Sequence, residues 1–237
     1  MSVEIRKAVE GSRLPFFNPG PIKFDWDKPL RNIKPVYKAL LPLGFLIMHL
    51  QYRSIETHGV WNIPKEGAFV MAANHQSSFD PISLYYGMKG RRVMYIMAKE
   101  EFFHTFYVRW LFEFFNAFPV YRDRSDKTSL EFAKRVLKEG YVLTIFPQGT
   151  RDLSHGKPTD FKPGAALIAR EAKADVLPVS IHLEKRKFRP KIIIRYGEII
   201  PYEDLGFTEG SRKSRELRSA SQKIEKSVQD LWEIDSL

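Results

Sequence analysis

Ala68-Phe-Val-Met-Ala-Ala-Asn-His-Gln-Ser-Ser-Phe-Asp80 is an apolar run that ends in a cluster of polar residues. The apolar half predicts a short strand. Open α/β sheets commonly build their sites where strands end, so we expect the polar residues at the carboxyl edge of a sheet. The run therefore indicates a layered α/β protein with a candidate site directly after this strand.

From residue 52 onward, short β-rich runs alternate with helical stretches, as in α/β domains. The sequence predicts an α/β fold with a mixed, largely parallel central sheet flanked by helices, and an N-terminal membrane-interfacial helical segment. We expect the segment at 1–51 and the α/β domain at 52–237. The expected strands are 53–58, 68–73, 93–98, 118–121, 141–146, 176–182 and 191–196. The expected helices are 105–115, which is rich in large apolar residues and predicted to be buried, 127–139, 163–173 and 212–234, whose apolar stripe is expected to pack on the core.

Composition restricts the class of protein and of partner. Apolar residues at 43% and charged residues at 28% are typical of a folded domain. The chain has no cysteine, which excludes disulfides, thiolate metal sites and a cysteine nucleophile. A net charge of +10 favours a polyanionic partner: nucleic acid, an anionic membrane or a phosphorylated substrate. The densest basic run, Lys185–Lys191, suits lipid headgroups, a nucleotide-bearing cosubstrate or an acidic carrier protein, and an ordinary solvated turn is the alternative.

The N-terminal region contains the longest apolar run, Ala39–Leu50. It is too short to span a bilayer, which takes about 20 apolar residues, and it does not have the features of a signal peptide. An aromatic and basic stretch precedes it, with Phe16, Phe17, Phe24 and Trp26. These aromatic residues suit a membrane interface, or they pack on the domain as an irregular arm.

His75 and Asp80 are the candidate catalytic residues. An imidazole titrates near neutrality and can take a proton from a hydroxyl group, and a carboxylate bonded to its other nitrogen fixes its tautomer. Their spacing on a regular helix would leave the two side chains roughly 140° apart, so a turn is needed to bring them together. Pro81 suits the first turn of a helix, which leaves open that Asp80 only caps that helix.

Two further strings carry arginine after an expected strand. Phe146-Pro-Gln-Gly-Thr-Arg151 ends in Arg151, whose planar guanidinium can bind a phosphate through two hydrogen bonds. Phe118-Pro-Val-Tyr-Arg-Asp-Arg124 brings Arg122 and Arg124 to another strand end. Arg122 and Arg124 also suit a phosphate, and for the string that ends in Arg151 a turn with a surface arginine is the alternative.

Taken together and in this order, the strings resemble the glycerolipid acyltransferase family, most closely its bacterial 1-acyl-sn-glycerol-3-phosphate acyltransferases. Asn74–Asp80 is similar to the N-H-x-x-x-x-D block of that family. Phe118–Arg122 resembles the second block, Phe146–Arg151 the F-P-E-G-T-R block, and Leu177–Ser180 a V-P-V-type strand. The resemblance covers close to half of the chain.

The resemblance implies roles for these residues. His75 would deprotonate a glycerol hydroxyl with Asp80 as its partner. The implied site for the acceptor phosphate consists of Arg122, Gly149, Thr150 and Arg151.

Three more residues are candidate support for the oxyanion or the phosphate: Lys99, Arg124 and Gln148. Gln148 departs from the family, which usually has glutamate there. An amide keeps the shape and the hydrogen-bonding capacity of the carboxylate but not its charge.

The implied reaction is direct transfer of a fatty acyl group from a thioester to the sn-2 hydroxyl of lysophosphatidic acid, giving phosphatidic acid. Acyl-CoA or acyl-acyl carrier protein is the expected cosubstrate, with no permanently bound cofactor and no metal. The expected partners are these substrates and a phospholipid membrane surface, with no nucleic acid, and the expected location is the cytoplasmic face of the membrane, as a monotopic or peripheral protein. Glycerol 3-phosphate or another lysophospholipid as acceptor, or a catalytically silent membrane-bound relative, stay open as alternatives.

Overall fold

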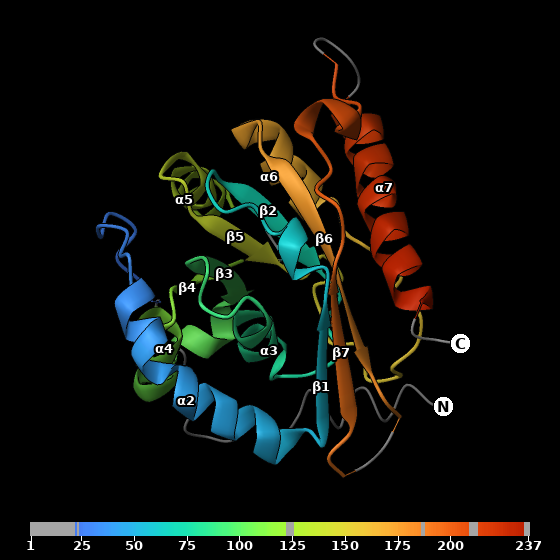
Figure 1. The fold of residues 1–237 in the computed structure, drawn as a ribbon. Coiled ribbons are helices and arrows are strands. Elements are labelled where there is room, and N and C mark those ends of the chain that lie inside the picture. Colours follow the sequence, from blue (N-terminus) through green and yellow to red (C-terminus); the bar gives the residue numbers. More distant parts are fainter. Residues whose placement is uncertain (1–21, 23, 122–125, 186–187, 209–212, 235–237) are drawn as a thin grey trace, which may run out of the picture.

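A single sheet of seven strands, in the order β1-β7-β6-β2-β5-β3-β4, organises the molecule (Figure 1). The structure is a computed structural model that describes residues 22, 24–121, 126–185, 188–208 and 213–234. The strands are β1 (Ser54–His58), β2 (Phe69–Ala73), β3 (Met94–Lys99), β4 (Ala117–Val120), β5 (Val142–Ile145), β6 (Asp175–Leu183) and β7 (Lys191–Tyr196). Among the strand pairs of the described residues, β6 with β7 is antiparallel and the others are parallel. This confirms the mixed, largely parallel arrangement.

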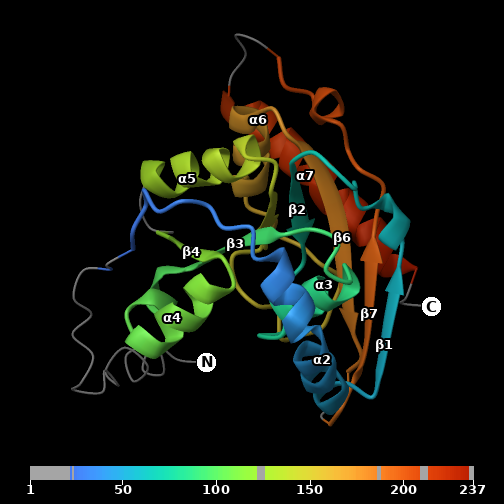
Figure 2. The same ribbon diagram turned by 60° about the vertical axis from the view of Figure 1, so that its left-hand side comes forward.

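Helices cover both faces of the sheet. The α-helices are α2 (Lys34–Gln51), α3 (Asp80–Gly87), α4 (Phe106–Phe114), α5 (Lys127–Lys138), α6 (Gly164–Ala172) and α7 (Lys213–Glu233). Short 3-10 helices are η1 (Val60–Asn62), η2 (Glu100–Phe103) and η3 (Tyr202–Leu205). Helices α5, α6 and α7 lie on one face, and α2, α3 and α4 lie on the other (Figure 2).

The central strands explain where the candidate site lies. Every residue of β2 is buried, as is every residue of β5, so both strands read as continuous apolar runs in the sequence. β2 lies between β5 and β6 in the middle of the sheet. The polar residues that follow Ala73 therefore leave the sheet at the centre of its carboxyl edge.

The described part of the N-terminal region packs on the domain. Phe24 is buried, and its ring meets those of Trp26, Phe103 and Phe132 edge to face. Packing as an irregular arm is thus the correct alternative for Phe24 and Trp26, whereas Phe16 and Phe17 lie outside the described residues. Among the helices described, none combines the length and the apolar content that crossing a membrane requires.

Two expectations about helix burial have opposite outcomes. The stripe of α7 packs on the sheet as predicted, with Ala220, Ile224 and Val228 buried. The prediction of a buried helix at 105–115 was wrong, because no residue of α4 is buried. This short helix connects β3 to the edge strand β4, so its large side chains outnumber the core positions available to them.

Candidate active site

Two amide side chains hold the loop after β2 against β6. Asn74 is buried; its Oδ1 accepts from the Ile181 N–H at 2.7 Å and its Nδ2 donates to the Ile181 carbonyl at 2.8 Å. The Gln76 Oε1 accepts from the Leu183 N–H at 2.9 Å. β2 has ended at this point of β6, so the side-chain amides supply the hydrogen bonds that a neighbouring strand would otherwise make. Neither residue was assigned this role from the sequence, although their spacing of two matches the two N–H groups that they bind.

His75 and Asp80 are in direct contact. The His75 Nδ1 lies 2.7 Å from the Asp80 Oδ2, across the turn that their spacing required. Asp80 is fully buried, and the same oxygen accepts from the backbone N–H groups of Gln76 at 2.6 Å and Ser77 at 2.8 Å. Phe79 is the residue that precedes α3, so Asp80 is the first residue of that helix and its carboxylate points back to the loop.

The phenol of Tyr52 lies close to the Asp80 carboxylate. The Tyr52 side chain is buried nearby; burial raises the pKa of its phenol, and the negative charge of Asp80 raises it further. The phenol of Tyr52 therefore stays protonated at neutral pH and is an uncharged neighbour of this pair.

The loop after β5 packs directly on His75. The Gln148 Oε1 accepts from the His75 N–H at 2.8 Å, and the Asp152 N–H donates to the His75 carbonyl at 2.8 Å. The Phe146 ring stacks on the imidazole with 4.2 Å between ring centroids. A hydrogen bond from the Ser154 side chain lowers the pKa of the Asp152 carboxyl. Two of the predicted strings therefore form one structural unit around the imidazole.

Cationic groups lie on the same loop. The Arg151 guanidinium donates to the Ser78 Oγ at 2.5 Å, which ties it to the loop that carries His75. Gly149 has a φ of +74°, a left-handed conformation that favours glycine. Lys162, which no motif indicated, lies beside it: a Cβ placed on Gly149 would be 3.1 Å from the Lys162 Nζ. Thr150 is exposed between Gly149 and Arg151.

The remaining predicted site residues lie elsewhere or are not described. Lys99 ends β3, which β5 separates from β2, so the two strand ends are about 10 Å apart. Lys99 forms an ion pair with Glu101. Arg122 and Arg124 lie outside the described residues. Within the described ranges, histidine and carboxylate side chains do not gather in threes, so no metal-binding group is found there.

Comparisons with known proteins agree with this arrangement. A sequence model of the Acyltransferase family matches residues 54–182. The chain is 32% identical over 126 residues to the 1-acyl-sn-glycerol-3-phosphate acyltransferase of Bacillus subtilis, covering 53% of this chain and 61% of that relative. It is 26% identical to the enzyme of the same name from Streptococcus pneumoniae, covering 75% of this chain and 67% of the relative. The match thus spans less than two thirds of the Bacillus protein.

A solved structure has the same fold. The crystal structure of the 1-acyl-sn-glycerophosphate (LPA) acyltransferase PlsC from Thermotoga maritima superposes with a TM-score of 0.63 at 26% identity, covering 84% of this chain and 80% of that one. The family match includes more than half of the chain and all of the loops around His75. This chain therefore belongs to the Acyltransferase family.

Proposed function

We propose that this protein transfers a fatty acyl group from an acyl thioester to the sn-2 hydroxyl of lysophosphatidic acid, forming phosphatidic acid. The observation that carries the proposal is the 2.7 Å contact between His75 Nδ1 and Asp80 Oδ2, at the edge that also holds Arg151 and Lys162. A base and a cationic group beside it suit an acceptor with both a hydroxyl and a phosphate. The names of the relatives support the same reaction.

His75 is proposed as the general base. Because its Nδ1 is engaged by Asp80, the Nε2 is the nitrogen that meets the acceptor hydroxyl. The Nε2 takes the hydroxyl proton as the oxygen attacks the thioester carbonyl. The tetrahedral intermediate then expels the thiolate, which receives that proton from the imidazolium. Asp80 orients the imidazole and stabilises the imidazolium, as the orienting carboxylate does in Ser-His-Asp triads.

The acceptor phosphate is proposed to bind on the β5 loop. Gly149 lets the backbone approach it, Thr150 offers a hydroxyl, and Arg151 and Lys162 supply positive charge. Arg122 and Arg124 stay proposed contributors from the family resemblance. Lys99 is proposed only as support for the oxyanion, because it ends β3, which lies two strand spacings from β2 in the sheet.

Gln148 is consistent with an active enzyme. Its Oε1 accepts a hydrogen bond from the His75 N–H, a function that an amide and a carboxylate both perform. The departure from the usual glutamate therefore does not argue for a silent relative. Glycerol 3-phosphate and other lysophospholipids stay the competing acceptors, because all of them offer a hydroxyl near a phosphate.

The proposed setting is the surface of a phospholipid membrane, at its cytoplasmic face, with the protein bound peripherally. On α2, four apolar side chains are about half exposed or more: Leu43, Phe45, Leu46 and Leu50. Such a face suits the headgroup boundary, where the lysolipid substrate resides. The acyl donor is proposed to be acyl-CoA or acyl-acyl carrier protein, since both are anionic thioesters.

Mass spectrometry tests the reaction. Purified protein is incubated with lysophosphatidic acid, vesicles and a panel of acyl thioesters, beside His75→Ala and the control His58→Ala, whose partly buried histidine lies at the end of β1, away from the candidate site. We expect phosphatidic acid from the parent and the control, and none from His75→Ala. Product from a folded His75→Ala protein would remove the proposed base, and product only with another acceptor would transfer the proposal to that acceptor.

A further inference from the structure

Helix α4 exposes a patch of large apolar side chains. Phe106 is 63% exposed, Tyr107 80%, Trp110 61% and Leu111 46%. Their positions repeat after four residues, so they share one side of the helix. Contiguous aromatic exposure of this kind on a folded domain marks a surface that contacts something else.

The other side of α4 is firmly held, so this exposure is not that of a loose helix. Phe112 meets the buried Phe103 edge to face at 5.9 Å between ring centroids. The Lys28 ammonium lies 2.9 Å from the Glu113 carboxylate, and the Arg31 guanidinium donates to the Glu113 carbonyl at 2.8 Å. The packed side therefore fixes which residues of α4 face outward.

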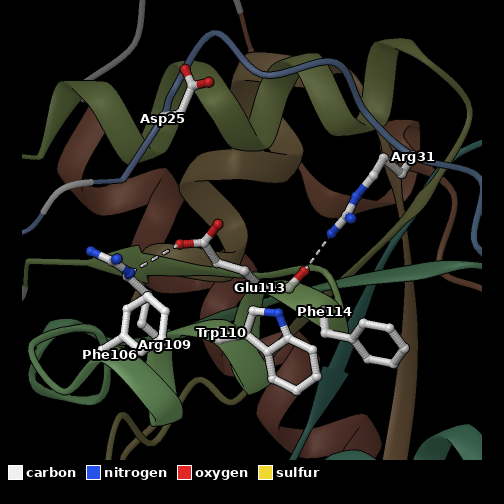
Figure 3. Close-up of a pocket in the computed structure, with 7 residues that line it drawn as sticks. All are labelled: Asp25, Arg31, Phe106, Arg109, Trp110, Glu113 and Phe114. Carbon is white, nitrogen blue, oxygen red and sulfur yellow. Dashed lines mark hydrogen bonds and ion pairs between the residues drawn. The ribbon is translucent and has the colours of Figure 1, made fainter.

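The chemistry of the exposed side matches that of a lipid headgroup region. A cavity of about 280 Å³ separates α4 from the segment that precedes α2. Figure 3 shows the rings of Phe106, Trp110 and Phe114 along its lower side, Asp25 and Arg31 above them, and Glu113 between the two. Tryptophan and tyrosine with an arginine rim are typical of residues at a membrane interface, where one end of a side chain is apolar and the other is hydrated.

The position of α4 is compatible with a bilayer that also contacts α2. Both helices lie on the same face of the sheet (Figure 1 and Figure 2). Each presents exposed apolar side chains, and the net charge of the chain is +10. An anionic surface that reached both helices would be attracted by this charge.

We propose that α4 is a second membrane-docking helix, which inserts Phe106, Tyr107, Trp110 and Leu111 into the headgroup boundary of an anionic phospholipid bilayer. This inference rests on the proposed function, which places the protein at a lipid surface. With two contacts instead of one, the bilayer also fixes the orientation of the molecule, and with it the direction from which a lysolipid reaches the carboxyl edge of the sheet.

Quenching of tryptophan fluorescence by brominated lipid tests the contact directly. The full chain is bound to vesicles of phosphatidylcholine and phosphatidylglycerol, with and without brominated acyl chains, and compared with Trp110→Phe. The matched control is Trp61→Phe: Trp61 is 81% exposed in η1, which follows the opposite end of β1 from α2. We expect Trp110→Phe to lose most of the quenched emission and Trp61→Phe to keep it. Quenching that is unchanged in Trp110→Phe overturns the proposal.

A second measurement covers the other residues of the patch. The double variant Phe106→Ser with Tyr107→Ser should lower the vesicle partition coefficient by at least about tenfold, because burial of one aromatic side chain is worth about that factor. Trp61→Ser should leave the coefficient unchanged, and circular dichroism checks the fold of both. A double variant that binds vesicles like the parent overturns the proposal, and so does one whose only defect is the loss of a dimer in light scattering. Neither readout uses turnover, so bromolipid quenching without phosphatidic acid formation supports the docking helix and counts against the proposed function alone.

Discussion

Replacing Asp80 by asparagine separates the charge of this residue from its geometry. In the parent, one carboxylate oxygen accepts from the His75 Nδ1 and from the backbone N–H groups of Gln76 and Ser77. The N–H groups of Gln76 and Ser77 are donors and need an acceptor. They therefore orient the introduced asparagine so that its amide oxygen, and not its NH2 group, takes the position of the Asp80 Oδ2. Asp80→Asn therefore keeps the tautomer of His75 and removes only the negative charge.

The expected loss is set by the interaction of imidazolium with carboxylate. The two atoms in contact are 2.7 Å apart, and the centres of charge are about 4 Å apart, which corresponds to about 4 kcal/mol at an effective dielectric constant of about 20. The imidazolium is present only after the hydroxyl proton has moved, so this energy is lost from the transition state. Since each 1.36 kcal/mol is a factor of ten, kcat should fall on the order of a thousandfold.

Release of the thiol from acyl-CoA is the appropriate assay. The chain has no cysteine, so a thiol reagent reads only released coenzyme A. The expected pattern is a large fall in kcat with little change in the KM for either substrate, and an unfolding free energy in urea close to that of the parent. A kcat within tenfold of the parent, from a protein of unchanged stability, would refute the role of Asp80 as the charge partner of His75.

Three more predictions concern other parts of the site and the surface. Gln148→Met removes the acceptor of the His75 N–H and should lower the unfolding free energy by about 1–3 kcal/mol in a urea titration, whereas Gln148→Glu should retain both stability and turnover; an equal effect of both would exclude the acceptor role. Arg151→Ala should raise the KM for lysophosphatidic acid at least about tenfold and leave that for the thioester unchanged in steady-state kinetics, with a weaker effect from Lys162→Ala; unchanged acceptor dependence would disprove the phosphate site. Leu46→Ser with Leu50→Ser should reduce vesicle partition about tenfold in co-sedimentation, and equal binding would locate the contact elsewhere.

The central strands of the sheet were predictable because their residues are all apolar or nearly so. β2 and β5 are buried on both faces, so their apolar runs start and stop within a residue of the expected bounds. The same reasoning was wrong for α4, because a high content of apolar residues does not by itself show that a helix packs in the core. A helix beside an edge strand has few core neighbours, and that fact depends on the strand order.

The sequence indicated three of the side chains that the structure brings together at this edge, His75, Asp80 and Arg151, because their chemistry is distinctive. Their roles stay predictions. Lys162 was missed because it lies on the same loop but outside the Phe146–Arg151 string, and only the fold of the loop brings its side chain next to Gly149. The amides of Asn74 and Gln76 were missed for a related reason: their partners are backbone groups of β6, more than a hundred residues away.

Gln148 shows why the contact matters more than the residue type. Compared with the usual glutamate, Gln148 lacks a negative charge, and from the sequence alone this would be expected to alter the electrostatics next to a phosphate. In the structure its oxygen faces the backbone N–H of His75, where a carboxylate oxygen would serve equally. This position requires a side chain whose oxygen reaches the backbone N–H of His75 and accepts its hydrogen bond. Without it, that N–H would lack a partner in a half-buried site. Glutamine and glutamate both satisfy that requirement.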